Sequence, residues 1–166
     1  MPGKPLIEPS PIRRAALLLA VALTAAGTVL VWSGRPLVFM PGRGELSMFG
    51  IQPWVGWLAG VGLLLAFVSA LDAFFRGSIK ALMTLWTGWA MGCIGLVVSF
   101  WILVRDLILL REAVMAPGSG VSAAEAGELL GSLRLRPTSA TLVALLAVVP
   151  VAVFVAGWRR GRPGRP

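Results

Sequence analysis

Long apolar runs without a charged side chain dominate the pattern of this chain. They cover residues 15–33, 53–71, 81–104 and 137–158. Each run is close to or above the ~20 residues that a helix needs to cross ~30 Å of hydrocarbon. Backbone amides inside a bilayer have no water to bind, so segments of this length span it as helices, and they lack the alternation of a membrane strand. The pattern predicts four transmembrane helices.

The flanking residues extend two of these helices and define the loops. We expect helices at 15–33, 53–75, 81–114 and 138–158, outer loops at 34–52 and 115–137, and tails at 1–14 and 159–166. The third helix is expected to project ~15 Å beyond the membrane, because VRDLILLREAVM keeps apolar residues at helical spacing. A signal peptide is an alternative for the first run, but its 19 apolar residues exceed the usual ~7–15.

The outer loops contain short extended patterns. PLVFM, PGRG and ELSMFGIQP read as two segments joined by a turn, and SLRLRP alternates leucine with arginine. A two-stranded hairpin alone is marginal in water, so we predict a three-stranded outer sheet from residues 37–40, 46–52 and 132–136. Ser122 followed by Glu125 is a capping-box pattern, which predicts a short helix over SAAEAGELLG.

Two similar lead-ins precede the second and fourth runs. GELSMFGIQP begins at residue 44 and GELLGSLRLRP at residue 127. They are compatible with an internal repeat of two helical hairpins, with a chance match, or with residues that independently suit the start of a helix.

The predicted fold class is an all-α transmembrane, four-helix up-down bundle with a small extracytoplasmic sheet. This plan is similar to that of claudin-type tetraspan proteins, but the first outer loop has no cysteine pair and no Gly-Leu-Trp motif, so no function or residue is carried over.

Composition agrees with a bilayer and charge gives an orientation. Apolar residues make up 57% of the 166 positions and charged residues 13%, against roughly a quarter in soluble domains. With the N-terminus inside, the inner segments hold nine of the 15 basic residues and the outer loops six, which predicts two cytoplasmic termini. Trp32, Trp54, Trp57 and Trp101 fall at outer helix ends and Trp158 at an inner end, as interfacial belts require.

The residue types exclude several kinds of chemistry. The chain has no histidine, no tyrosine and one cysteine, Cys93, so we expect no cofactor and no metal site. The serines and threonines have no suitable base nearby, so no enzymatic activity is expected. The net charge of +8 is concentrated at the ends of the apolar runs, which favours lipid headgroups over nucleic acid as its partner.

The informative motifs concern helix packing. Gly56 with Gly60, and Gly88 with Gly92, form small faces that allow helices to approach closely, within the bundle or against a partner. Trp86 and Trp89 lie deeper in the third run, where packing between helices is favoured over a ligand pocket. Pro150 is expected to kink the fourth helix.

Charged residues close to the apolar runs are few. Asp72 with Arg76, and Arg105 with Asp106, are expected to form interfacial ion pairs, with a gate or a partner-docking charge as the alternative.

These patterns predict an integral protein of the bacterial cytoplasmic membrane. We expect a non-catalytic accessory, scaffold or assembly subunit, whose partners are the bilayer and other membrane subunits or further copies of itself. One alternative is a small oligomeric transporter or channel lined by Thr84, Thr87 and Ser99. Another is an envelope sensor that uses the outer sheet.

Overall fold

Four long helices form the body of the protein. The computed structural model describes residues 11–41, 43–116, 120, 122–132 and 134–158, so residues 1–10 of the predicted inner tail and all of 159–166 lie outside the described residues. The long helices are α1 (Pro11–Trp32), α3 (Pro53–Arg76), α4 (Ile79–Met115) and α6 (Pro137–Trp158). Each is long and apolar enough to cross a membrane, which marks the chain as a multi-pass integral membrane protein.

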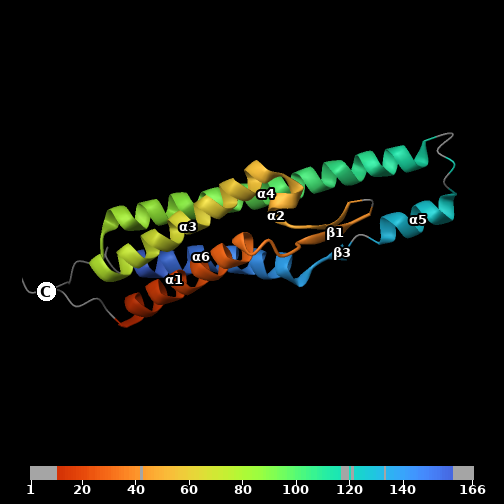
Figure 1. Cartoon of the computed structure of the whole chain (residues 1–166). Helices are drawn as coiled ribbons and strands as arrows, with labels where there is room; N and C mark the ends of the chain where they lie inside the picture. The colour runs from red at the N-terminus through yellow and green to blue at the C-terminus, as the bar shows by residue number, and fades with distance from the viewer. Residues whose placement is uncertain (1–10, 42, 117–119, 121, 133, 159–166) are drawn as a thin grey trace, which may run out of the picture.

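The connections between the long helices lie at two opposite ends of an elongated molecule (Figure 1). The start of α1, the turn between α3 and α4, and the end of α6 lie at one end. The strands and the two short helices lie at the other. At the tight turn, Gly77 adopts φ 64°, and its N–H donates to the carbonyl of Ala73 at 3.0 Å. This left-handed residue ends α3 at once and allows α4 to begin at Ile79.

A three-stranded antiparallel sheet joins the connection between α1 and α3 to the connection between α4 and α6. Its strands are β1 (Val38–Met40), β2 (Gly44–Leu46) and β3 (Arg134–Leu135), in the order β2-β1-β3. β1 is the central strand: Val38 lies opposite Leu46 of β2 and Leu135 of β3. The predicted contribution of a strand from the second connection is therefore confirmed, although Leu133 lies outside the described residues.

The second predicted strand, 46–52, is wrong for most of its length. The strand ends at Leu46, and α2 (Met48–Ile51) follows it. The hydroxyl of Ser47 accepts the N–H of Gly50 at 3.2 Å, which caps a helical turn. Met48 and Ile51 are both buried, and their three-residue spacing places them on one face of a helix, whereas a strand would turn them to opposite faces.

The repeated lead-ins adopt different structures. The letters GEL form β2 at residues 44–46 but belong to α5 (Ala123–Gly131) at residues 127–129. Gly44 has φ 76° and directs the first copy into a hairpin with β1, while the second copy continues a helix begun upstream. The shared letters therefore do not mark a shared local structure.

The predicted capping box opens α5. The N–H of Ser122 donates to Oε2 of Glu125 at 2.9 Å, and the N–H of Glu125 donates to the Ser122 hydroxyl at 3.3 Å. The backbone N–H and the hydroxyl of Ser122, which both donate to the Glu125 carboxylate, lower the pKa of Glu125. The four long helices lie within a few residues of their predicted bounds: α1 begins at Pro11, where residue 15 was expected, and α4 covers Ile79–Met115, where 81–114 was expected.

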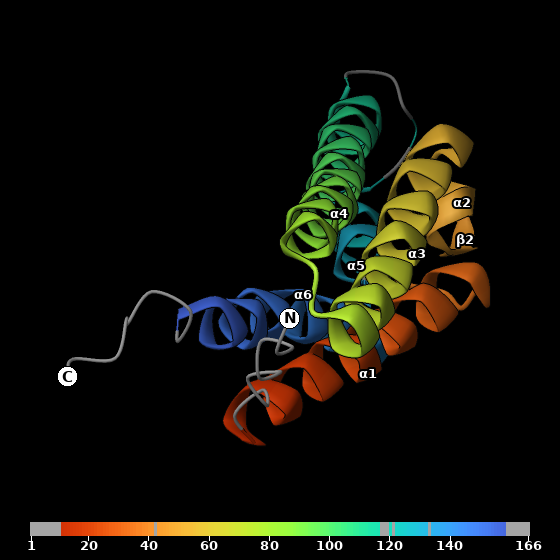
Figure 2. The ribbon, with the colours of Figure 1, turned by 90° about the vertical axis from the view of Figure 1, so that its left-hand side faces the viewer.

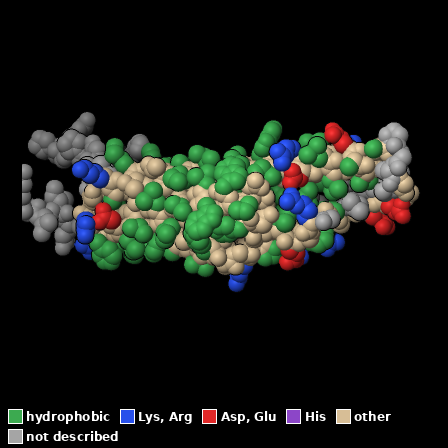
Figure 3. All heavy atoms as spheres, turned by 45° about the horizontal axis from the view of Figure 1, so that its top comes forward, with side chains coloured by type: hydrophobic (Ala, Val, Ile, Leu, Met, Phe, Trp, Pro, Cys, Tyr) green, Lys and Arg blue, Asp and Glu red, His purple; other side chains and the backbone are tan. Residues whose placement is uncertain are grey.

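The long helices pack as two pairs. Figure 2 shows α3 and α4 side by side, with α1 and α6 forming the other pair. Helix α1 also packs on α3, whereas α4 makes little contact with α6. One core cluster combines sheet residues such as Val38 and Met40 with helix residues such as Leu63 and Leu142, so one face of the sheet rests on the helix ends. In Figure 3 the middle of the visible face is largely hydrophobic and charged side chains gather toward both ends.

Candidate functional site

The contact between α3 and α4 is a close approach of two backbones. A Cβ atom at Gly88 would lie 2.6 Å from both the nitrogen of Ala66 and the carbonyl oxygen of Gly62. A Cβ at Gly92 would lie 3.1 Å from the side chain of Leu63. The two predicted glycines of α4 therefore face α3, inside the protein, and leave no room for a larger side chain.

The two predicted glycines of α3 face aromatic rings instead of α4. A Cβ at Gly56 would lie 2.5 Å from Phe49 of α2, and one at Gly60 would lie 3.0 Å from the indole of Trp32. Trp32, Phe49 and Trp57 form an aromatic cluster with ring centroids 5.1–6.1 Å apart. Sequence reasoning thus placed Gly56 and Gly60 in a small face, but their function in the structure is to seat the rings that hold α2 and the end of α1.

Two glycines were missed. Gly62 is the close partner of Gly88, and Gly95 continues the α4 face, because its Cβ would lie 2.8 Å from that of Ala59. The signals were present in the chain: Gly62, Ala66 and Ala70 repeat at four-residue intervals, and Gly95 lies three residues after Gly92, which keeps it on the same face of the helix as Gly88 and Gly92.

The contact between α4 and α6 depends on a side-chain hydrogen bond. The indole Nε1–H of Trp89 donates to the carbonyl of Leu146 at 2.8 Å. That carbonyl lies four residues before Pro150, which has no N–H with which to complete the helical bond. An unsatisfied carbonyl in hydrocarbon costs several kcal/mol, so Trp89 repairs the gap that Pro150 leaves in α6. Trp86 packs edge-on against Trp89, with ring centroids 5.3 Å apart.

Sequence reasoning found both members of this contact but did not pair them. Trp89 was assigned to packing and Pro150 to a kink, which stays a prediction; α6 runs through Pro150 to Trp158. The sequence signal was the indole N–H of a tryptophan in the third apolar run and, in the fourth run, a carbonyl whose usual backbone donor is replaced by proline. Pairing them requires the relative height of two helices that are not consecutive in the chain.

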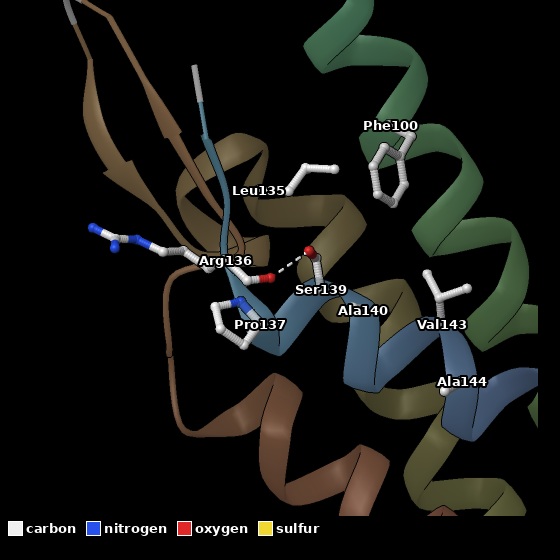
Figure 4. Close-up of a pocket in the computed structure, with 8 residues that line it drawn as sticks. All are labelled: Phe100, Leu135, Arg136, Pro137, Ser139, Ala140, Val143 and Ala144. Atoms are coloured by element: carbon white, nitrogen blue, oxygen red, sulfur yellow. Dashed lines mark hydrogen bonds between the residues drawn. The ribbon is translucent and has the colours of Figure 1, made fainter. Parts of the chain in front are cut away.

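A groove opens between α4 and α6 beside the sheet. Its volume is about 490 Å³. Its lining is apolar apart from Ser139 and the backbone of Arg136, and it comprises Phe100, Leu135, Arg136, Pro137, Ser139, Ala140, Val143 and Ala144. Figure 4 shows Leu135 and Phe100 on its two sides and the guanidinium of Arg136 pointing away from it. The hydroxyl of Ser139 donates to the carbonyl of Arg136 at 2.6 Å. The groove can therefore hold an apolar group, but none of its side chains is placed for acid-base chemistry.

The ion pairs differ between the two ends. Asp72 pairs with Arg76 at 3.3 Å at the end of α3, with the Arg76 side chain 82% exposed. At the other end, Asp106 is only 18% exposed and binds two arginines, Arg105 at 3.2 Å and Arg43 at 2.7 Å. Arg43 was not predicted, and its pair with Asp106 ties the hairpin turn to α4. A further pair, Arg136 with Glu45, ties the start of α6 to β2.

The three hydroxyl residues of the channel hypothesis do not converge within one copy. Thr84 and Thr87 are exposed, and each donates to the carbonyl four residues earlier, Lys80 at 3.0 Å and Met83 at 3.2 Å. Ser99 is buried and donates to the carbonyl of Gly95 at 2.9 Å. Back-bonded hydroxyls of this kind satisfy their own helix.

Helix α4 exposes a row of apolar side chains, which we name the α4 stripe: Val97, Trp101, Val104, Ile108 and Met115. A helix that enters the hydrocarbon at Lys80 would cross its thickness of about 30 Å by Trp101. Beyond it come the charged residues Arg105 and Asp106, yet Ile108 is still 50% exposed and Met115 59%. Leu109, beside the stripe, is exposed as well. Exposed apolar side chains gathered outside the hydrocarbon are typical of an interaction surface.

The parts of the chain that the structure describes hold no group of three or more acidic, histidine or cysteine side chains placed to bind a metal. Comparisons with known protein families, with curated proteins and with solved structures found no match.

Proposed function

We propose that this chain is a non-catalytic accessory, scaffold or assembly subunit of a bacterial membrane complex, and that the α4 stripe is one of its contacts with another protein. The observation that carries the proposal is the exposure of Ile108 and Met115 past the charged residues Arg105 and Asp106. Apolar side chains inside the bilayer need no partner beyond lipid, whereas these two face the aqueous side. A contacting protein would remove their apolar area from water.

The proposal includes an orientation in the cytoplasmic membrane. The chain would cross as an up-down bundle, with both termini and the α3–α4 turn in the cytoplasm and the sheet as an extracytoplasmic cap. Arg14, Arg76 and Lys80 support it, because they lie at or near the end of the helices opposite the sheet. Reporter fusions after residue 158 test it: cytoplasmic activity is expected, and activity on the outer side would contradict the orientation.

Affinity purification from native membranes in mild detergent, followed by mass spectrometry, tests the function. Stoichiometric recovery of other membrane proteins is expected. Ile108→Glu should reduce recovery of the protein that covers the α4 stripe, whether another subunit or a second, differently tagged copy of the chain, because it places a charge on that surface. Ala113→Glu is the matched control, since Ala113 is exposed on the same part of α4 but does not belong to the stripe. Recovery of the chain alone, as a monomer, would overturn the proposal.

A further inference from the structure

The α4 stripe has the spacing of a coiled-coil seam. Its members follow one another at intervals of four, three, four and seven residues from Val97 to Met115. Alternating intervals of three and four average 3.5 residues, the repeat that keeps two supercoiled helices in contact along one line. Position 111 falls where the missing seam residue belongs, and Arg111 occupies it.

We propose that the partner on the α4 stripe is a second copy of this chain, with the two α4 helices packed in parallel about a two-fold axis along the membrane normal. This inference rests on the proposed function, because it names the protein that covers the same surface. A parallel arrangement follows from topology: two copies inserted alike have their α4 helices pointing the same way. The α4 stripe of one copy then contacts the α4 stripe of the other, as an isologous two-fold interface requires.

The charges at the seam are self-complementary. Arg111 would enter a hole of the facing helix formed by four residues, and one of these is Glu112, the residue after the seam position. Arg111 and Glu112 are both exposed in the single copy. Two-fold symmetry therefore creates two Arg111–Glu112 contacts, one from each copy. A polar residue at one seam position also fixes the register, as single polar positions do in coiled coils.

The rest of the helix surface agrees with this assignment. The glycine face of α4 is already occupied by α3, and Trp89 is turned toward α6. The α4 stripe is thus a separate face. It continues past Arg105, where lipid no longer covers it.

Cysteine cross-linking tests the proposal in the full chain. Cys93 is the one native cysteine and is replaced by alanine. Ile108→Cys then places a thiol on the seam, and Ala113→Cys places one on the same exposed part of α4 away from it. A disulfide needs Cα atoms about 4.4–6.8 Å apart, which facing seam residues satisfy and residues on outward faces do not. Oxidation should therefore yield a covalent dimer from Ile108→Cys and little from Ala113→Cys.

The same two variants separate failure of this inference from failure of the proposed function. In permeabilised native membranes, a thiol covered by any protein resists a bulky maleimide. Protection of Ile108→Cys without dimer formation would mean that a different protein covers the α4 stripe, which overturns the second copy and keeps the proposed contact. Free labelling of Ile108→Cys, equal to that of Ala113→Cys, would overturn both.

A charge exchange tests the register. Arg111→Glu places four acidic side chains together at the seam, and we expect the dimer to dissociate about tenfold more readily. Adding Glu112→Arg to the same chain restores opposite charges in reversed order and should recover most of the dimer. Single-molecule photobleaching in liposomes measures the dimer fraction. Equal dimer fractions in all three proteins would overturn the assigned pairing.

Discussion

Helix α4 contacts α3 and α6 by two opposite means. Against α3, Gly88 and Gly92 bring the backbones together along a continuous face. Against α6, one indole bond from Trp89 reaches the carbonyl of Leu146, and the part of the border beside the sheet opens into a groove. Lipid removes most of the hydrophobic incentive for helices to associate, so either close packing or a buried hydrogen bond must hold them. The α3–α4 contact therefore tolerates almost no increase in side-chain volume. The α4–α6 contact tolerates added volume at the groove but not loss of the Trp89 hydrogen bond.

The largest effect is expected at the α3–α4 contact. Gly88→Val adds three carbons where a single Cβ would already lie 2.6 Å from two backbone atoms of α3. Because backbone atoms cannot rotate away, we expect a loss of ~3 kcal/mol or more and failure to recover a monodisperse protein. Size-exclusion chromatography and thermal unfolding in detergent measure this.

The matched control is Gly127→Ala, a helical glycine of α5 with open space around its Cβ position. It should stabilise α5 slightly, by ~0.5–1 kcal/mol. A normal melting temperature for Gly88→Val would refute the close approach of the two backbones.

The second effect concerns the bond to Leu146. Trp89→Phe keeps a ring but removes the N–H, which leaves the carbonyl of Leu146 without its donor, and we expect a loss of ~1–2 kcal/mol. Pro150→Ala supplies a backbone N–H to the same carbonyl. In that background Trp89→Phe should cost ~1 kcal/mol less.

A double-mutant cycle in steric-trapping or thermal unfolding measurements gives this coupling. Trp86→Phe serves as the control, because it makes the same change on a neighbouring ring that packs edge-on against Trp89. If the effects of Trp89→Phe and Pro150→Ala simply add, Trp89 does not repair the gap left by Pro150.

Sequence reasoning correctly predicted the elements that depend only on residues within a single segment. Four apolar runs of membrane length predicted four helices, and Ser122 with Glu125 predicted the start of α5, because the lengths and spacings lie within single segments. The strand over 46–52 was misassigned because Ser47 suits an extended segment and a helix cap equally well. Met48 and Ile51 favour the helix because it places both of them against the core, and this core is formed by other segments of the chain.

The site depended on information that no single segment holds. Gly56 and Gly60 satisfy the same small-residue pattern as Gly62, and only the rotation of α3 about its axis decides which of them meets α4. The Trp89–Leu146 bond and the groove require the relative height of α4 and α6. The α4 stripe could have been read from its 3.5-residue spacing, but its exposure could not, because α3 covers an equally apolar face of the same helix.

A smaller effect is expected from filling the groove. Ala140→Leu adds apolar volume to the border between α4 and α6, where about 490 Å³ is open, so stability should change by less than ~0.5 kcal/mol. Ala66→Leu makes the same substitution at the fully buried contact with Gly88 and should cost ~1–3 kcal/mol. Thermal unfolding of the two variants side by side tests the comparison directly. Equal losses would mean that the α4–α6 border is as tightly packed as the α3–α4 contact.

The smallest effect lies outside both contacts, at the start of α5, where local bonds hold the helix. The backbone N–H and the hydroxyl of Ser122 hold the ionised carboxylate of Glu125 and lower its pKa. A lowered pKa in the folded protein means that the capping bonds contribute fully above the ordinary glutamate pKa and are lost as pH falls through the lowered value. Hydrogen exchange at the amide of Ser122 should therefore accelerate in acid, after correction for intrinsic rates. Glu125→Gln should abolish this pH dependence and Glu128→Gln, on the same helix, should preserve it. Unchanged acid-dependent exchange in Glu125→Gln would show that α5, like the long helices, is held by packing and not by its cap.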